Sequence, residues 1–226
     1  MLRSLVGSEM CIRDSPQADC RLFMINLCMI LLNEAHCIAS TLDSAAPYVG
    51  HYCILDTGST DGTQEIVREV MAQHHVPGTV HQGPFTDYAD TRNRCAQLAG
   101  NIEPFILWMD ADDILEGGDS LRFLLTIAKG TCFQIEQKWP DRDSLWVPRV
   151  VRADSGWQYK GRVHEILTHE HERMSNLVGP RLRHYPSAIG AARSQARWPN
   201  DVLLLNKMLI EDPQTVSYTH LTAADD

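Results

Sequence analysis

The sequence predicts an α/β fold: a mostly parallel central sheet flanked by helices, with a small antiparallel extension and a C-terminal helix. First, four strand-like segments, most of them followed by a helical pattern, alternate in the first half of the chain, as in parallel sheets with right-handed crossovers. Second, apolar runs such as residues 22–32 are continuous, as in strands buried on both faces. Third, after Gly118 short strand-like segments are separated by Asp, Gly and Pro turns.

The first half contains four predicted strands and three predicted helices. Apolar runs predict strands at residues 22–32, 52–55, 78–82 and 104–109. A helix is expected to open at Asn33-Glu34 and stop near Pro47. Two more are expected at residues 62–73 and 90–99. Each helix connects two strands, so the sheet is expected to be parallel.

The second half has a different pattern. One helix is expected at residues 120–129, and strand-like segments follow at 132–137, 145–151 and 163–168. The last helix, residues 194–210, is amphipathic. We expect one domain over residues 17–215, with two halves of different pattern, residues 21–116 and 117–215.

Composition excludes several classes of protein. Of 226 residues, 44% are hydrophobic and 22% charged, which is typical of globular proteins and not of disordered chains. The net charge of −9 argues against nucleic acid as a partner. The longest apolar run has eleven residues, too short for the roughly 20 of a transmembrane helix, so no transmembrane segment is expected.

The seven cysteines form an odd number and contain no C-x-x-C pair. Most of them lie among apolar residues. We therefore expect reduced core cysteines of a cytoplasmic protein, acting in the cytoplasm or at the inner face of the membrane, and not zinc ligands or disulfides.

Both ends of the sequence look foreign to the fold. Residues 1–16 and 216–226 lack periodic patterns and resemble translated sequencing adapters, so both are expected to be artefactual tails. Ordinary frayed termini are the alternative interpretation.

The segment DTGSTDGT, residues 56–63, follows the second predicted strand. Ligands of open α/β sheets bind at the carboxyl ends of strands, where Asp56 can accept hydrogen bonds from a ribose or base. The same residues suit an Asx turn followed by a helix cap. The sequence alone leaves both interpretations open.

Three carboxylates, Asp110, Asp112 and Asp113, follow the apolar strand 104–109. They repel one another unless a hard cation neutralises them, and a D-x-D pair can hold Mg²⁺ or Mn²⁺ against a diphosphate. A solvated acidic turn is the alternative.

Two further motifs carry candidate residues. Arg92 lies in a first helical turn and can present its planar fork to a base or phosphate, or form a surface ion pair. His164 can ligate a metal and Glu165 can be a general base, although such a pair in a strand is most often structural. Because strand side chains alternate, both can share one site only if the backbone is irregular between Gly161 and Ile166.

Taken in order, these motifs resemble family 2 glycosyltransferases of the GT-A fold. The matching segments are MILLNE (29–34), ILDTGSTDGT (54–63), DYADTRNRCAQLA (87–99) and ILWMDADDIL (106–115). The segments at 148–167 and RLRHY (181–185) resemble a bacterial branch whose members often continue into tetratricopeptide repeats. The resemblance implies a GT-A-type sheet and inverting transfer of a sugar from a nucleotide-diphosphate donor, with a UDP-sugar favoured. It also implies that residues 21–116 form a nucleotide-binding half and residues 117–215 an acceptor-side half.

The resemblance also implies roles for individual residues. The acceptor is a hydroxyl or other nucleophile on a glycan, a lipid-linked molecule or a peptide, and the cofactor is Mn²⁺ or Mg²⁺. Asp112 would bind the metal with His164 or His184. Glu165 would be the general base, with Asp113 or Glu136 as alternatives. The residues implied to bind the nucleotide sugar are Asn33, Glu34, Asp56, Gly58, Ser59, Asp90, Arg92, Asp110 and Asp112.

Two alternative functions require sequence features that differ from those of a glycosyltransferase, and a third does not. A sugar-nucleotide nucleotidyltransferase needs a Gly- and Arg-rich phosphate loop after the first strand, where this chain has Leu32-Asn33-Glu34. A receiver-like phospho-acceptor needs a Lys on a later strand, which Lys129 and Lys138 fit poorly. An inactive nucleotide-binding or scaffold module would keep the fold and bind UDP with Mn²⁺ without turnover.

Overall fold

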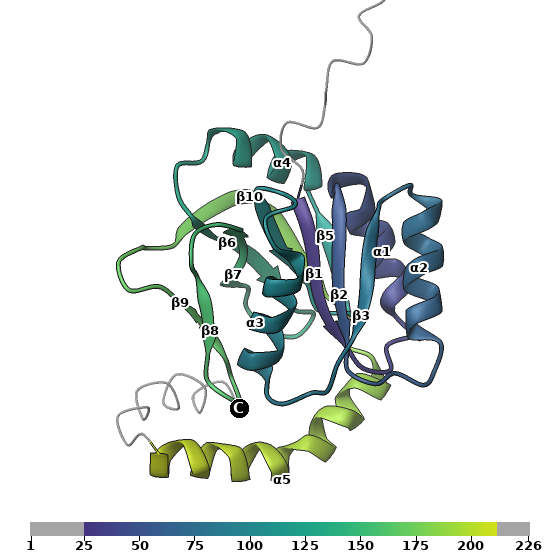
Figure 1. The fold of residues 1–226 in the computed structure, drawn as a ribbon, viewed down its shortest axis with the longest axis vertical. Coiled ribbons are helices and arrows are strands. Elements are labelled where there is room, and N and C mark those ends of the chain that lie inside the picture. The colour runs from purple at the N-terminus through teal and green to yellow at the C-terminus, as the bar shows by residue number, and fades with distance from the viewer. Residues whose placement is uncertain (1–24, 212–226) are drawn as a thin grey trace, which may run out of the picture.

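A computed structural model describes residues 25–211. The two expected tails, residues 1–16 and 216–226, lie outside this range. The core is an eight-stranded sheet with the order β3-β2-β1-β4-β7-β6-β10-β5, and a separate two-stranded sheet pairs β8 with β9 (Figure 1). None of the helices within residues 25–211 has the length and apolar character that a membrane crossing requires.

The first half forms the predicted parallel sheet. Its strands are β1 (Ile25–Leu31), β2 (His51–Asp56), β3 (Gly78–Gln82) and β4 (Phe105–Trp108), and β1–β2, β2–β3 and β1–β4 all pair in parallel. Helices α1 (Ile38–Ala45), α2 (Thr63–Gln73) and α3 (Tyr88–Ala99) connect them, and a 3-10 turn, η1 (Ala46–Tyr48), follows α1.

Helix α1 begins four residues later than the sequence predicts. Asn33 adopts a left-handed backbone with φ of 55°, which is incompatible with a helix start at this residue. Residues 33–37 instead form a turn between β1 and α1. This turn becomes part of the candidate site.

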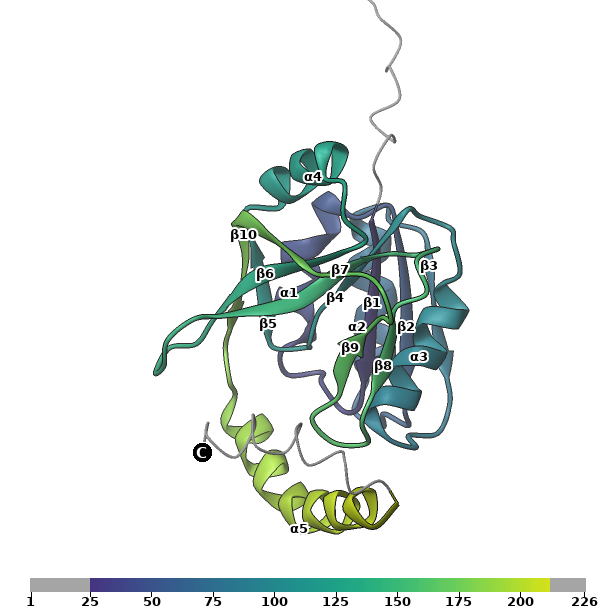
Figure 2. The same cartoon turned by 90° about the vertical axis from the view of Figure 1, so that its left-hand side faces the viewer.

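Side chains of the buried strands alternate between two apolar cores. In β1, Leu27 and Met29 face the core beneath α1 and α2, whereas Cys28 faces the core beneath α3. The Asn93 side-chain amide donates to the Tyr159 carbonyl at 2.9 Å and accepts from its backbone N–H at 2.9 Å, which ties α3 to the hairpin of β8 and β9 beside it (Figure 2).

The second half contains both predicted and unpredicted elements. Helix α4 (Gly118–Ile127), β6 (Cys132–Lys138), β7 (Leu145–Arg152) and β9 (Ile166–Thr168) correspond to predicted segments. The expected antiparallel extension is partly built into the main sheet, because β7 pairs antiparallel with both β4 and β6. Three strands were not predicted: β5 (Asp113–Glu116), β8 (Gln158–Lys160) and β10 (Ser175–His184).

Two of the unpredicted strands lack the local pattern that identifies a strand. Strand β10 contains Gly179-Pro180, and its pairing with β6 shifts register between Asn176 and Arg181 at this point. Strand β5 is only four residues long and begins with Asp113, one of the three carboxylates that we assigned to the candidate cation-binding motif.

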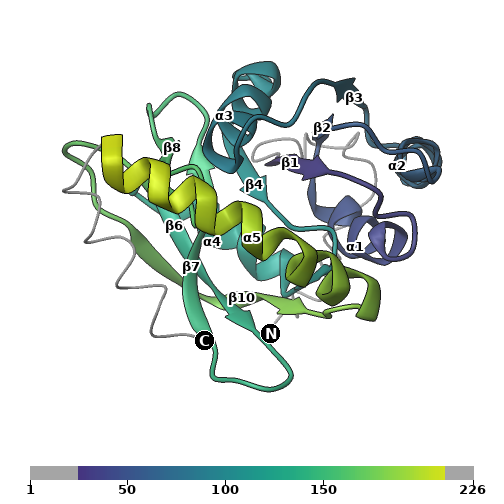
Figure 3. The same cartoon turned by 90° about the horizontal axis from the view of Figure 1, so that it is seen from below.

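Helix α5 (Ala188–Glu211) is longer than predicted and runs across the end of the sheet where the parallel strands finish (Figures 1 and 3). Its Arg193 Nη1 donates to the carbonyls of Leu32 at 2.6 Å and Asn33 at 3.0 Å, both just after β1. The candidate site residues at this edge therefore lie next to α5.

Candidate active site at the carboxyl edge of the sheet

Asp56 ends β2 and is fully buried. Its Oδ1 accepts hydrogen bonds from the backbone N–H groups of Gly58 (3.0 Å) and Ser59 (2.8 Å) and from Gln64 Nε2 (2.9 Å). The Asx turn is thus real. Oδ2 is also buried and has no hydrogen-bond partner within residues 25–211, so a polar ligand atom would satisfy it. The two interpretations of this motif are compatible.

The turn after β1 is tied to the loop after β2. Ser59 Oγ accepts from the Asn33 N–H at 2.8 Å, and Asn33 Oδ1 accepts from the Thr60 N–H at 2.8 Å. Gly58 has φ of 118°, which other residues rarely adopt. Glu34 Oε2 accepts from Arg193 Nη2 at 2.9 Å. Asn33 and Ser59 therefore use these groups to hold the two loops together.

Arg92 on α3 joins two of the candidate carboxylates. It is 7% exposed, and it donates from Nη2 to Asp110 Oδ1 at 2.8 Å and from Nε to Glu165 Oε1 at 2.7 Å. Its guanidinium carbon lies 5.5 Å from the ring centroid of Trp108 and 5.4 Å from that of Tyr159. Burial alone would lower the pKa of Arg92, but the charges of Asp110 and Glu165 and the hydrogen bond to Asp110 together raise it. Arg92 is a buried connector and not a surface ion pair.

Asp110 is held by a second arginine that the sequence analysis did not assign. Arg149 on β7 donates from Nη2 to Asp110 Oδ2 at 2.7 Å and to Gln137 Oε1 at 2.8 Å. Loss of water alone would raise the pKa of Asp110, but Arg149 and Arg92 hold it well below its usual range. Asp110 is therefore a fixed carboxylate anion.

Asp112, Asp113 and His184 form a candidate metal group, in which one ligand atom of each lies within 4.8 Å of the others. Pairing of β5 with β10 places His184 opposite Asp113, and the Tyr185 N–H donates to the Asp112 carbonyl at 2.8 Å. His184 Nδ1 lies 3.1 Å from Asp113 Oδ1 and 3.5 Å from Asp112 Oδ1. Two carboxylates and one imidazole suit Mn²⁺ or Mg²⁺.

Burial and neighbouring charges shift the pKa values of Asp112 and His184. Burial, with Asp113 and Asp110 nearby, raises the pKa of Asp112, although His184 opposes this. Burial lowers the pKa of His184, but its hydrogen bond with Asp113 and the charge of Asp112 raise it overall. Asp113 is fully buried, with Oδ1 accepting from Gln137 Nε2 at 3.2 Å and Oδ2 from the Asp110 N–H at 3.2 Å.

The segment 161–165 has the irregular backbone that the sequence analysis required. Gly161 has φ of 102° and His164 has φ of 53°, and β9 begins only at Ile166. Glu165 faces Arg92 and its side chain is 14% exposed, whereas His164 is exposed and lies outside the Asp112, Asp113 and His184 group. The structure therefore brings Glu165, and not His164, to the Arg92 network.

Two other candidates lie elsewhere. Asp90 is half exposed, pairs with Arg94 Nε at 2.9 Å and accepts a hydrogen bond from Thr86 Oγ1. Glu136 on β6 accepts from Ser144 Oγ at 2.7 Å and lies 3.8 Å from Lys138 Nζ. A cavity of about 390 Å³ beside α3 is lined in part by Asp90, Asn93, Tyr159, Arg162 and Met208, and its lining does not include Asp56, Asp110 or Asp112.

Comparisons with known proteins identify relatives of this chain. The model of the family described as glycosyl transferase family 2 matches residues 27–187. A TPR repeat-containing protein of Synechococcus elongatus is 32% identical over 113 residues, which are 49% of this chain and 26% of that protein. The chain therefore matches about a quarter of the length of this curated relative.

Two solved structures share the fold. S. aureus TarS 1-349 in complex with UDP-GlcNAc superposes with a TM-score of 0.57 at 14% identity, covering 75% of this chain and 61% of that chain. A structure of S. aureus TarS gives a TM-score of 0.51 at 15% identity, covering 61% of this chain and 30% of that chain. At this identity the likeness concerns the fold, which is of the GT-A type.

Proposed function

The chain belongs to glycosyl transferase family 2, and from this premise we propose that it transfers a sugar from a nucleoside-diphosphate donor to a nucleophilic acceptor, with inversion at the anomeric carbon. The observation that carries the proposal is the Asp112, Asp113 and His184 group beside the fixed Asp110 anion, at the carboxyl edge of the sheet. This edge is the usual ligand edge of open α/β sheets. The acceptor is a hydroxyl or similar nucleophile of a glycan, a lipid-linked molecule or a peptide.

In this proposal the first two strands hold the nucleoside. Asp56 Oδ2, buried and without a hydrogen-bond partner in the described chain, accepts a hydrogen bond from the base. The turn at Asn33-Glu34 and the loop at Gly58-Ser59 shape the pocket, because they are hydrogen-bonded to each other. UDP-GlcNAc in the fold relative TarS supports a UDP-sugar as donor.

In this proposal Asp110 binds the ribose of the donor, and Asp112 binds the metal ion at the diphosphate. Asp110, locked by Arg92 and Arg149, accepts from the ribose hydroxyls. Asp112 and His184 would hold Mn²⁺ or Mg²⁺. When bound, the ion neutralises charge on the diphosphate leaving group. Asp113, buried and hydrogen-bonded to His184, orients the imidazole, as carboxylates commonly do for metal-binding histidines.

Glu165 is the proposed general base. Its carboxylate takes the proton of the acceptor hydroxyl as the acceptor oxygen bonds to the anomeric carbon, and the bond to the nucleoside diphosphate breaks. Arg92 supports this role because it fixes one oxygen of Glu165 at 2.7 Å and connects Glu165 to Asp110. A base at a fixed distance from the donor is what an in-line displacement needs.

A donor screen with a metal-site variant tests the function. Purified protein is incubated with UDP-, GDP- and dTDP-sugars and Mn²⁺, and sugar release is measured. We expect turnover with one donor, and in Asp112→Asn we expect Mn²⁺ to lose its tightening effect on UDP binding, measured by calorimetry. The matched control is Asp119→Asn, an exposed carboxylate on α4, which should behave as wild type.

Three results would contradict the proposal. Absence of UDP, GDP and dTDP binding excludes a transferase of nucleotide sugars. Binding without turnover of any donor indicates a scaffold. Unchanged metal dependence in Asp112→Asn refutes the metal assignment alone.

A further inference from the structure

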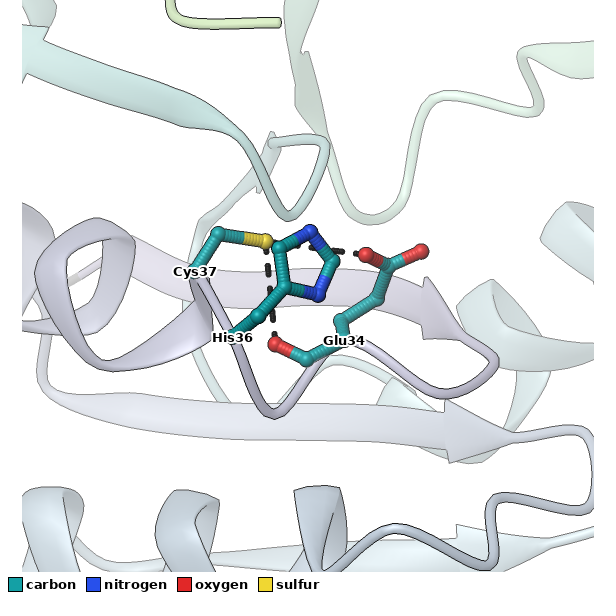
Figure 4. A group of neighbouring side chains, drawn as sticks. All are labelled: Glu34, His36 and Cys37. Carbon is teal, nitrogen blue, oxygen red and sulfur yellow. Dashed lines mark hydrogen bonds between the residues drawn. The ribbon is translucent and has the colours of Figure 1, made fainter. Parts of the chain in front are cut away.

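A second group of metal-ligand side chains lies on the turn between β1 and α1. Glu34, His36 and Cys37 each place one ligand atom within 4.8 Å of the others (Figure 4). Glu34 and Cys37 are half-buried and His36 is exposed, so solvent ions can reach the group. None of the three belongs to the group formed by Asp112, Asp113 and His184.

The backbone of this turn is fixed by hydrogen bonds at both ends. The Glu34 N–H donates to Thr63 Oγ1 at 2.8 Å, and the Ala35 N–H donates to Asp61 Oδ2 at 3.0 Å. The Cys37 and Ile38 N–H groups donate to the Glu34 carbonyl at 3.1 and 3.0 Å. The three side chains therefore start from a preorganised backbone, and binding orders only their rotamers.

We propose that Glu34, His36 and Cys37 bind one Zn²⁺ ion at a site separate from the donor-metal group. Thiolate, imidazole and carboxylate are the ligands that zinc takes in proteins, and three protein ligands leave a fourth tetrahedral position for water. The Asp112, Asp113 and His184 group offers no sulfur and suits Mn²⁺ or Mg²⁺. The two groups therefore select different metals.

Arg193 is a positive group in contact with this site, and its contacts are compatible with a cation. Arg193 Nη2 donates to Glu34 Oε2 at 2.9 Å, but Nη1 also donates to the Leu32 and Asn33 carbonyls. It keeps two acceptors when the Glu34 carboxylate turns to the ion. His36 Nε2 pairs with Ser187 Oγ at 2.7 Å, and the imidazole has a second nitrogen to offer.

The thiol is already directed at the carboxylate. Cys37 Sγ lies 3.6 Å from Glu34 Oε2 and 3.6 Å from the Glu34 carbonyl oxygen. On binding, the S–H bond breaks, a zinc–sulfur bond forms and the proton passes to solvent. Burial, with Glu34 and Asp112 nearby, raises the pKa of the Cys37 thiol to about 12, although Arg193 opposes this. The thiol therefore keeps its proton in the metal-free protein and releases it only when the ion binds.

This site differs from the sequence-based expectation that no cysteine is a zinc ligand. Cys28, Cys53, Cys95 and Cys132 are buried core thiols as expected, but Cys37 is only half-buried. The sequence alone offers no reason to propose this site, because Glu-x-His-Cys within one turn is not a zinc-binding spacing that sequence rules recognise.

Cobalt substitution tests the proposal, because a thiolate bound to Co²⁺ gives a charge-transfer absorption that carboxylate and imidazole ligands do not give. Metal-free full-length protein is titrated with Co²⁺, and Zn²⁺ is then added to displace it. We expect one Co²⁺ per chain with this absorption, no such absorption in Cys37→Ser, and Co²⁺ affinity at least about tenfold weaker in His36→Ala.

Two matched controls separate this site from other ligands. His184→Ala removes the other imidazole, and Cys11→Ser/Cys20→Ser removes the cysteines outside residues 25–211; both should keep the absorption. The proposal is overturned if Cys37→Ser retains the absorption or if either control loses it. Because His36 is exposed, His36→Ala is expected to fold, and unchanged Co²⁺ affinity there overturns the proposal independently of Cys37→Ser.

Discussion

Glu165 offers a test of the chemistry that leaves the surrounding contacts in place. In Glu165→Gln the amide oxygen can still accept from Arg92 Nε, so the positions of Arg92 and Asp110 are kept while the base is lost. We expect kcat to fall by roughly 10²-fold or more, the usual scale for a general base, with donor affinity nearly unchanged. Steady-state kinetics measure the split between kcat and KM.

The control for this variant is Glu170→Gln, an exposed carboxylate just after β9, which should retain wild-type kcat. Near-normal turnover in Glu165→Gln would show that Glu165 is not the base.

Arg92 links two carboxylates from separate segments, and a lysine there tests whether the planar fork matters. A lysine ammonium keeps the charge but cannot reproduce the forked contacts with both Asp110 and Glu165. Because Arg92 is 7% exposed, we expect Arg92→Lys to lose about 1.5–3 kcal/mol of unfolding free energy and to weaken nucleotide binding. Urea unfolding and calorimetry measure the two effects.

Arg68→Lys is the matched control, since Arg68 is half exposed and lies 3.7 Å from Glu65 on the same helix. Its stability should stay within about 0.5 kcal/mol of wild type. Equal stability of Arg92→Lys and wild type would show that the network contributes nothing to folding.

The candidate site could be predicted only where its residues carry a local pattern. Asp56, Asp110 and Asp112 follow apolar strands, and this position alone indicates the ligand edge of the sheet. Arg149 and Gln137 show no such pattern, because they lie within β7 and β6 and meet Asp110 and Asp113 only when the sheet is assembled. His184 was named, but its pairing with Asp113 depends on β5 and β10, which were not predicted.

At the scale of elements, the loop from β8 to β9 presents Glu165 through two left-handed residues. Gly161 has φ of 102°, and an alanine there is strained by about 1–2 kcal/mol even though its Cβ finds no contact closer than 3.5 Å. We expect Gly161→Ala to lose this much stability and also to lower kcat, because the turn that sets Glu165 must shift. Thermal unfolding and steady-state kinetics check both.

Gly156→Ala is the matched control, since Gly156 has φ of 78° in the preceding turn and its Cβ would meet only His169 Nε2, at an ordinary contact distance of 3.9 Å. It should lose similar stability with unchanged kcat. An equal loss of kcat in both variants would show that general destabilisation, and not the position of Glu165, is the cause.

Among the strands, too, only those with a local sequence pattern could be predicted. Strands β1, β2 and β4 are buried on both faces, so their sequences are continuous apolar runs that a strand pattern detects. Strand β10 carries Gly179-Pro180 at its register shift and alternating arginines at its end, and β5 is short and acidic. Their strand geometry comes from neighbours in the sheet and not from local propensity.

At the scale of the whole molecule, two apolar cores fix the sheet and leave its carboxyl edge for polar groups. Carboxylates at this edge come from the ends of β2 and β4 and from the segment before β9, and the arginines that hold Asp110 come from α3 and β7. Four of these residues far apart in the chain, Arg92, Asp110, Arg149 and Glu165, therefore form one charged network, and Asp56 lies outside it. The network is rigid because each arginine is buried and contacts more than one acceptor.

Helix α5 crosses this edge and is tied at both ends. Near its start Arg193 contacts Leu32, Asn33 and Glu34, and at its end Glu211 Oε2 lies 2.8 Å from Arg162 Nη2. Much of the helix is solvent-exposed, so these contacts, more than apolar burial, decide how often it detaches. In Arg193→Ala we expect backbone amides of α5 to exchange about tenfold faster, which corresponds to about 1.4 kcal/mol, while amides of β1 and β2 keep their protection. Hydrogen exchange with mass spectrometry measures this.

Arg183→Ala, which removes a surface pair with Glu116 at 2.9 Å, is the control and should leave the exchange of α5 unchanged. Faster exchange throughout the sheet in Arg193→Ala would mean that α5 is part of the global folding unit and does not detach as a separate element, because a local opening cannot change the exchange of strands that stay closed.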